Sequence, residues 1–303
     1  MPLSKKAFEI LSFVERKNGE KLSQRRIAAG ARLSLGAVNK AIPQLVEEGL
    51  LEITDSRSTY VTRAGLEALA PYRVKRAIIL AAGFGSRMMP ITLNTPKGLV
   101  KVRGKPIIET MLDAIVRAGI EEIYIVRGYL ADHYDILLKK YPNIIFVENP
   151  DYKESNTVSS AMKVLPLIRQ AYVIDSDIYL MNPDIIRKYE YCANYTGIYV
   201  EKTDDWCMVM KGDRIVGYTL GGTNCYHMCN ITYWTEEDGD KLMTRVPEMY
   251  AAPGGKERYW DEAPLLLYTD DFHVELRPCE EGDFIELDSL SELQEFDPVY
   301  RMN

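Results

Sequence analysis

Two glycines and two basic residues lie close together, directly after an apolar segment of the chain. Residues 77–82 are apolar and lead into Gly83, Gly85 and Arg87, and Lys97 follows. Glycines let backbone N–H groups approach an anion closely, and the two basic side chains add positive charge. The stretch therefore predicts a cradle for a polyphosphate.

The spacing excludes two common phosphate-binding loops. A Walker A loop requires Gly-Lys-Ser or Gly-Lys-Thr, and this sequence has neither. A dinucleotide-binding loop requires a third glycine where this chain has Met88. A tight turn with incidental charge is the alternative, but the combination of glycines and cations over residues 80–97 argues against it.

Acidic residues follow two further apolar segments. Asp175 and Asp177 come after residues 172–174, and Asp288 comes after residues 284–287. Carboxylates at the carboxyl ends of parallel strands lie where α/β folds bind ligands. Mg²⁺ that accompanies a triphosphate prefers one or two carboxylates. The pattern predicts a Mg²⁺ site, with solvated turn acids as the alternative.

The histidines and cysteines form no catalytic or metal-binding pattern. His133, His227 and His273 are isolated, and the five cysteines include no Cys-x-x-Cys pair. A structural zinc site is therefore not expected, and scattered thiols are typical of a reducing compartment. A phosphate that attacks a nucleoside triphosphate is already an anion and needs positioning and charge neutralisation rather than a general base.

These residues need a framework that brings strand ends together. Short apolar segments alternate with helical segments; the apolar ones are 77–82, 123–126, 144–147 and 172–174, and the helical ones are 107–116, 133–140 and 157–168. This alternation predicts an α/β fold with a doubly wound, Rossmann-like sheet. Four aromatic-rich segments then predict antiparallel additions, which make the sheet mixed: 196–200, 206–210, 214–220 and 228–234.

The chain resembles the sugar-nucleotidyltransferase superfamily over Leu80-Ala81-Ala82-Gly83-Phe84-Gly85-Ser86-Arg87-Met88-Met89-Pro90, followed by Pro96-Lys97. The resemblance implies that Arg87 and Lys97 are catalytic residues, which stabilise charge on the phosphates, and that Asp177 and Asp288 share Mg²⁺, with Asp175 behind them as an alternative. It also implies a set of nucleotide-binding residues: Leu80, Ala82, Gly83, Phe84, Gly85, Ser86, Asn156 and Ser159.

The later half of the chain is similar to the bacterial CTP:phosphocholine cytidylyltransferases, over about residues 75–295. The resemblance implies transfer of CMP from CTP to phosphocholine. A quaternary ammonium group is held by aromatic faces and carboxylates, and we expect Trp206, Tyr259, Trp260 and Asp261 to bind it. The alternative is that these aromatic residues are half-buried in the sheet, which is favoured for Trp234. Another acceptor, a polyol phosphate or a sugar 1-phosphate, also stays open.

The pattern of residues 1–72 predicts a small separate domain, which is followed by a nucleotidyltransferase domain at residues 73–303. Three helical segments and two short strands follow one another, an order that resembles the winged helix-turn-helix DNA-binding domains of bacterial regulators. The resemblance implies that the third helix and the wing contact DNA, through Ser34, Asn39, Lys40 and Arg57. Pro43 is expected to kink or shorten that helix. The alternative is a domain for dimerisation or packing.

Charge and composition set further expectations. Residues 1–72 hold 11 Lys and Arg against 8 Asp and Glu, whereas the whole chain has a net charge of −7, so the second domain is acidic. No membrane-spanning run or signal-peptide pattern is evident, which predicts a cytoplasmic protein. A transcription regulator that uses the nucleotidyltransferase fold as a ligand sensor is the rival interpretation, and the presence of Arg87, Lys97, Asp177 and Asp288 argues against it. Regulatory winged helices are usually dimeric, so a homodimer is a further expectation.

Overall fold

The computed structural model describes residues 2–17, 19–54 and 58–301. The chain divides into two units. The N-terminal unit comprises Met1–Arg73 with Tyr189–Tyr191, and the transferase unit comprises Val74–Lys188 with Cys192–Asn303. The segment Tyr189–Tyr191 was not predicted to join the N-terminal unit; its Tyr191 ring stacks on Tyr72 at 5.4 Å.

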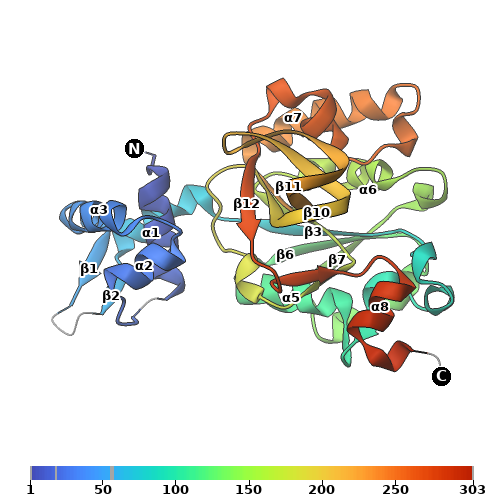
Figure 1. Ribbon diagram of the computed structural model, residues 1–303, viewed down its shortest axis with the longest axis horizontal. Coiled ribbons are helices and arrows are strands. Elements are labelled where there is room, and N and C mark those ends of the chain that lie inside the picture. The colour runs from blue at the N-terminus through green and yellow to red at the C-terminus, as the bar shows by residue number, and fades with distance from the viewer. Residues whose placement is uncertain (1, 18, 55–57, 302–303) are drawn as a thin grey trace. The chain divides into compact units, whose positions relative to one another are not determined.

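The N-terminal unit consists of short helices and one two-stranded ribbon (Figure 1). Its elements are α1 (Lys5–Arg16), α2 (Gln24–Gly30), α3 (Leu35–Glu47), β1 (Leu51–Ile53), β2 (Thr59–Val61) and α4 (Arg63–Leu69). The first three helices begin after serine residues, because the hydroxyls of Ser4, Ser23 and Ser34 each accept a first-turn amide hydrogen at 3.2 Å. The order of elements agrees with the sequence prediction; the assignment to winged-helix domains stays a prediction.

The expected effect of Pro43 is wrong. Helix α3 runs from Leu35 to Glu47 with Pro43 inside it. A proline in a helix leaves the carbonyl of the fourth preceding residue, here Asn39, without its usual amide partner. Pro43 and Asn39 are both exposed, so the unpaired carbonyl lies on the side of the helix that meets water, and the helix continues.

The transferase unit is built on a seven-stranded mixed sheet in the order β10-β12-β11-β8-β3-β6-β7, which confirms the predicted α/β class and mixed sheet. Its strands are β3 (Arg76–Ala81), β6 (Glu122–Arg127), β7 (Ile144–Glu148), β8 (Ala171–Asp175), β10 (Asn194–Lys211), β11 (Arg214–Trp234) and β12 (Glu275–Cys279). Strand β3 pairs in parallel with both β6 and β8. Strand β11 pairs antiparallel with β8.

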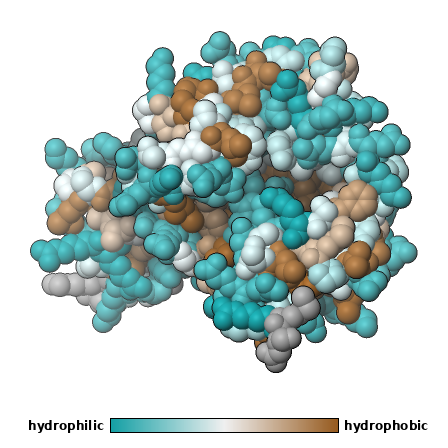
Figure 2. All heavy atoms as spheres, turned by 45° about the vertical axis from the view of Figure 1, so that its right-hand side comes forward, coloured by the Kyte–Doolittle hydropathy of each residue, from teal (hydrophilic) through white to brown (hydrophobic). Residues whose placement is uncertain are grey.

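Helices cover both faces of this sheet (Figure 1). Ala77 and Ile79 of β3 pack with α5 (Ile107–Arg117) on one face. Ile78 and Leu80 pack on the other face with α6 (Thr157–Val164) and α7 (Glu236–Ala251). A strand that is buried on both sides is apolar along its length, which explains the pattern of residues 77–82. On the face shown in Figure 2, hydrophilic side chains predominate and hydrophobic ones are scattered among them.

Two secondary-structure predictions for this unit differ from the structure in detail. The four aromatic-rich segments belong to only two long strands, β10 and β11, which pair with several register shifts. Their polar linking residues stay in the ladder, because bulges bend a strand without ending it; Lys202, for example, pairs with Thr223. The helix predicted at 133–140 is a 3₁₀ helix, η5 (Ala131–Lys139). The Arg127 guanidinium donates a hydrogen bond to the carbonyl oxygen of Ala131 at 3.1 Å. This bond competes with the α-helical hydrogen bond to the same oxygen.

Two small ladders and one helix complete the unit. Strands β4 (Lys101–Val102) and β5 (Lys105–Pro106) form one ladder, and β9 (Ile178–Leu180) and β13 (Phe284–Glu286) form the other. Helix α8 (Leu290–Phe296) begins at Ser289 with a capping box. Cys207, Cys225 and Cys229 are thiols that form no disulfide. Within the described residues, no helix has the length and apolar character needed to cross a membrane.

Candidate active site

The transferase unit contains a cavity of about 440 Å³ at the carboxyl ends of β3 and β8. Most of the predicted site residues line it: Leu80, Gly83, Phe84, Gly85, Ser86, Arg87, Lys97, Asn156, Asp177, Trp206, Tyr259, Trp260, Asp261 and Asp288. Of the residues predicted to bind the nucleotide, Ala82 and Ser159 do not line the cavity. Thus residues from six separate segments of the chain meet in one space.

The glycine loop has a conformation that its residue types require. Gly85 has a φ of +61°, and a Cβ there would lie 3.0 Å from Thr92 Cγ2 and 3.1 Å from Lys97 Cβ. The hydroxyl of Thr92 donates to the carbonyl of Gly85 at 2.8 Å. A Cβ at Gly83 would meet nothing within 4 Å. The loop therefore folds tightly at Gly85 and leaves its backbone open beside Gly83, as close approach of a phosphate requires.

A charged cluster lies beside this loop and consists of Arg87, Lys97, Asp177, Glu286 and Asp288. Lys97 Nζ donates to Asp177 Oδ2 at 2.8 Å and to Asp288 Oδ1 at 2.7 Å. Arg87 Nη2 lies 3.0 Å from Asp288 Oδ1. Burial alone would lower the pKa of Lys97, but Asp177 and Asp288 outweigh it and raise the pKa above its ordinary value. Lys97 is therefore a fixed positive charge.

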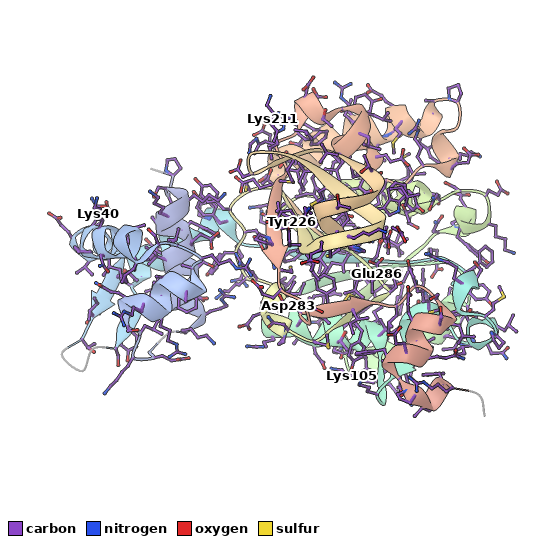
Figure 3. The ribbon with its side chains drawn as sticks, viewed as in Figure 1. Lys40, Lys105, Lys211, Tyr226, Asp283 and Glu286 are labelled. Carbon is purple, nitrogen blue, oxygen red and sulfur yellow. The ribbon has the colours of Figure 1, made fainter. Side chains whose placement is uncertain are left out.

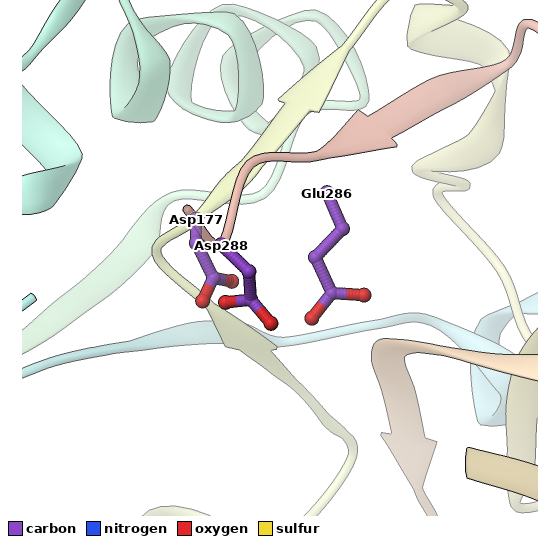
Figure 4. Close-up of side chains that lie close together, drawn as sticks. All are labelled: Asp177, Glu286 and Asp288. Atoms are coloured by element: carbon purple, nitrogen blue, oxygen red, sulfur yellow. The ribbon is translucent and has the colours of Figure 1, made fainter. Parts of the chain in front are cut away.

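The three carboxylates of the charged cluster come together through the β9–β13 ladder (Figure 4). Asp177 directly precedes β9, and the amide of Leu287 donates to the carbonyl of Asp177 at 3.1 Å. Glu286 and Asp288 are two residues apart on one extended segment, so they project to the same side. The amide of Asp288 donates to Glu292 of α8 at 2.7 Å, which fixes the far end of the segment.

These carboxylates fit a divalent cation. One oxygen from each of Asp177, Glu286 and Asp288 lies within 4.8 Å of the others, near the roughly 4 Å between opposite ligands of Mg²⁺ with bonds of about 2.1 Å. Asp177 Oδ1 is buried and has no hydrogen-bond partner among the described residues. Sequence reasoning found Asp177 and Asp288 but missed Glu286, although its position two residues before Asp288 was the available signal.

An aromatic cluster lines another part of the cavity and consists of Trp206, Tyr218, Tyr259 and Trp260. Trp206 meets Tyr218 at 5.3 Å and Tyr259 at 6.2 Å between ring centroids, both nearly edge-on. Trp260 is buried and packs on Trp234 at 5.6 Å. Trp234 is fully buried and does not line the cavity, in agreement with the core role favoured for it. Tyr218 was not predicted.

A chain of polar contacts runs from Asp261 to the charged cluster. The Tyr195 hydroxyl lies 3.1 Å from Asp261 Oδ2 and also contacts Asn230 Oδ1. Asn230 Nδ2 donates to Glu286 Oε1 at 3.2 Å, and His227 Nε2 lies 3.8 Å from Glu286 Oε2. The Tyr195 hydroxyl has one hydrogen, so it donates to one of these two oxygens at a time. Sequence reasoning missed Tyr195 and Asn230 because no motif marks them.

Burial governs the acids of this polar chain. It raises the pKa of Asp261 to about 6, against a smaller opposing effect of the Tyr195 hydrogen bond. It raises the pKa of Glu286 to about 7, with Asp177 and Asp288 adding to the effect and His227 opposing it. Asp175 also lines the cavity, and burial raises its pKa well above the ordinary value, with Asp177 adding to the effect. The cavity therefore favours ligands that carry positive charge near these acids.

Two residues that were predicted to bind the nucleotide form side-chain hydrogen bonds with neighbouring protein groups. The Asn156 side chain caps α6 by accepting from the Thr157 amide at 2.8 Å, and it donates to the Glu257 carbonyl at 3.1 Å. Ser159 is buried, donates to the Asn156 carbonyl at 3.1 Å and accepts from Asn149 at 3.0 Å. Asn156 therefore both borders the cavity and positions the chain, whereas Ser159 supports Asn156 from behind.

The residues predicted to contact DNA lie on α3 and at its start. Asn39 and Lys40 are exposed on this helix, and Lys40 is labelled in Figure 3. Ser34 is exposed and caps the helix through the Ala37 amide. Arg57 lies outside the described residues. The structure therefore leaves Asn39 and Lys40 accessible on the helix that was predicted to enter a DNA groove.

Comparisons with known proteins agree with this geometry. The family model of the MobA-like NTP transferase domain matches residues 77–234. A 2-aminoethylphosphonate cytidylyltransferase from Lancefieldella rimae is 32% identical over 228 residues, which cover 74% of this chain and 92% of the relative. A choline-phosphate cytidylyltransferase from Streptococcus pneumoniae is 29% identical over 228 residues, 75% of this chain and 98% of the relative.

A solved structure extends the likeness to the fold. The CTP:phosphocholine cytidylyltransferase of Streptococcus pneumoniae superimposes with a TM-score of 0.70 at 29% identity, covering 76% of this chain and 100% of the other. The N-terminal 76 residues are not part of the matched family model, which begins at residue 77.

Proposed function

This chain belongs to the MobA-like NTP transferase domain family, and we propose that it is a cytidylyltransferase that transfers CMP from CTP to phosphocholine. The observation that carries the proposal is a single cavity in which the charged cluster and the aromatic cluster face one space. The first suits a triphosphate, and the second suits a small acceptor with a cationic group.

The reaction joins an oxygen of the acceptor's phosphate to the α-phosphorus of CTP. The bond between the α-phosphorus and the oxygen bridging to the β-phosphate breaks, and pyrophosphate leaves with that electron pair. The attacking oxygen is already anionic, so no side chain has to remove a proton. Lys97 and Arg87 neutralise charge as it develops on the phosphates, while the backbone beside Gly83 and Gly85 contacts them.

We propose that Asp177, Glu286 and Asp288 hold Mg²⁺, which when bound neutralises charge on the triphosphate. Two of these carboxylates, Asp177 and Asp288, contact Lys97. We expect Lys97 to exchange part of this contact for phosphate oxygens when the nucleotide binds, because a fixed cation stabilises either anion.

The aromatic cluster and Asp261 are proposed to bind the acceptor's cationic group. Trp206 and Tyr259 offer ring faces at the cavity wall, and Asp261 offers a carboxylate that forms no ion pair within the described part of the chain. A primary ammonium group fits the same features, and the relative that acts on 2-aminoethylphosphonate, at 32% identity, makes that phosphonate the second candidate acceptor.

Pyrophosphate release with CTP, Mg²⁺ and a panel of acceptors tests this proposal. The panel includes phosphocholine, 2-aminoethylphosphonate, glycerol phosphate and glucose 1-phosphate. Release with phosphocholine above all others is expected. Release with 2-aminoethylphosphonate instead would keep the reaction and replace the acceptor, and release with glucose 1-phosphate alone would overturn the role of the aromatic cluster. No release with any acceptor or nucleotide would favour a ligand sensor.

For the N-terminal unit we propose DNA binding through α3, supported by the exposure of Asn39 and Lys40 and by the order of its elements. The test is fluorescence anisotropy with a pool of duplex DNA at several salt concentrations. Lys40→Ala should reduce the slope of log affinity against log salt by about 1, because one phosphate contact is lost. Lys6→Ala on α1 is the control, and no binding at low salt would contradict the proposal. Light scattering of the same sample tests the predicted homodimer.

A further inference from the structure

Asn230 has an uncommon backbone conformation at a cavity wall. It lies inside β11 with a φ of +35°, a left-handed value that few residues other than glycine, asparagine and aspartate adopt at low cost. Its side chain lines the cavity. Such conformations persist where the surrounding structure over-determines them, and they gather at functional sites. The contacts of the Asn230 side-chain amide are therefore of functional interest.

The Asn230 side chain contacts a hydroxyl that can donate a hydrogen bond and a carboxylate that accepts one. Its Oδ1 faces the hydroxyl of Tyr195 on β10, and its Nδ2 donates at 3.2 Å to Oε1 of Glu286 on β13. A hydroxyl donates and a carboxylate accepts, so only this orientation of the amide satisfies both contacts. A single neutral side chain thus connects the main sheet to the separate β9–β13 ladder.

Glu286 depends on such a contact more than Asp177 and Asp288 do. Asp177 and Asp288 have short side chains that Lys97 holds at 2.8 and 2.7 Å. Glu286 is longer, and a long side chain has about 1.5–2 kcal/mol of rotamer freedom to lose on being ordered. Its other polar partner is His227, at 3.8 Å. The Asn230 amide therefore provides the shorter of the two contacts that direct the Glu286 carboxylate.

We infer that Asn230 is a positioning residue that holds Glu286 in line with Asp177 and Asp288 to complete a divalent-cation site. This inference rests on the metal site of the proposed function. Residues that orient metal ligands typically affect metal affinity about 10- to 100-fold. Asn230 does not itself join the three carboxylates; it determines where the third one points.

The test measures Mn²⁺ binding by the full chain, using the electron paramagnetic resonance signal of free Mn²⁺, in the presence of CTP. Asn230→Gly removes the amide and keeps a backbone that accepts a positive φ. We expect it to weaken Mn²⁺ binding about 10- to 100-fold. Asn224→Gly is the matched control, because Asn224 lies on the same strand with a φ of +50° and contacts Tyr199 away from the cavity.

A double-mutant cycle separates positioning from a general structural role. If Asn230 acts through Glu286, Asn230→Gly should have little further effect on Mn²⁺ binding in a Glu286→Gln background. An equal loss in both backgrounds, or wild-type binding by Asn230→Gly, would overturn the inference and leave the metal site standing. If Asn230→Gly does not fold, Asn230→Ser serves in the same cycle. Failure of the wild-type protein to bind Mn²⁺ would overturn the proposed metal site together with this inference.

Discussion

The charged cluster and the aromatic cluster share one cavity but differ in how their charges are balanced. Asp177 and Asp288 are paired with Lys97, and Arg87 also contacts Asp288. Asp261, beside the aromatic cluster, receives a hydrogen bond from Tyr195, and no ion pair to it is found among the described residues. The protein thus supplies the cations of the charged cluster, and we propose that a ligand supplies the cation beside Asp261.

The relatives differ in the acceptor, to which we assign the aromatic cluster, and not in the nucleotide, to which we assign the charged cluster. Those named as cytidylyltransferases share the nucleotide but differ in acceptor, 2-aminoethylphosphonate in one and choline phosphate in another. We infer that the charged cluster serves the reaction that these proteins have in common, whereas the aromatic cluster selects the acceptor. Damage to the first should therefore affect every acceptor equally, and damage to the second should affect acceptors unequally.

The largest effect is expected from Lys97→Met. Loss of this cation leaves Asp177 and Asp288 without their shared partner and removes charge stabilisation from the phosphates, and we expect kcat to fall about 10³-fold. The measurement is pyrophosphate release with phosphocholine and with 2-aminoethylphosphonate. Lys105→Met is the control, since Lys105 also forms an ion pair, with Asp113 at 2.6 Å, but outside the cavity. A loss confined to one acceptor would contradict the division.

The charged cluster is also the part of the site that sequence reasoning describes best. Gly83, Gly85 and Arg87 lie within five residues of one loop, and their chemistry depends on residue type and spacing, which a sequence displays directly. Asp177 and Asp288 each follow an apolar segment, which a sequence also displays, although the antiparallel β9–β13 ladder brings them together. Glu286 was missed although it lies two residues before Asp288, because the β9–β13 ladder that brings it to Asp177 pairs segments about a hundred residues apart.

The aromatic cluster and its polar neighbours were harder to predict. Trp206 and Tyr218 meet because β10 and β11 curl through several register shifts, and bulges of this kind leave little trace in periodicity. No motif marks Tyr195 or Asn230, and only their side-chain contacts and the backbone conformation of Asn230 distinguish them. Pro43 was expected to kink or shorten its helix, but the helix continues to Glu47.

The second prediction concerns stability and the unbalanced charge of Asp261. Burial raises the pKa of Asp261 to about 6, so the folded protein keeps a proton that the unfolded chain releases at about pH 4. The protonated form of Asp261 therefore contributes up to about 3 kcal/mol to the free energy of unfolding. This contribution is fully present below pH 4 and is lost as the pH rises through 6. Asp261→Asn lacks this loss and should gain stability relative to wild type between pH 4 and pH 8.

Urea denaturation at several pH values from 2 to 8 provides the measurement, and Asp113→Asn provides a control of opposite sign. Hydrogen bonds from Lys105 and Tyr141 outweigh the effect of burial and lower the pKa of Asp113 to about 2. Ionised Asp113 therefore adds stability above about pH 4, and Asp113→Asn should lose stability relative to wild type as the pH rises through 2 to 4. Equal pH dependence of wild type and Asp261→Asn would show that Asp261 ionises normally.

The smallest effect, and the one that most directly separates the two clusters, is expected from Trp206→Ala. A ring that contacts a cation contributes about 0.5–2 kcal/mol, so the KM for phosphocholine should rise about 2- to 30-fold. The KM for CTP should stay unchanged, because Trp206 does not belong to the charged cluster. Tyr199→Ala is the control, since Tyr199 is exposed on the same strand and packs against Tyr226 without lining the cavity. A parallel rise in both KM values would mean that Trp206 shapes the whole cavity, and the two clusters would then be one functional unit.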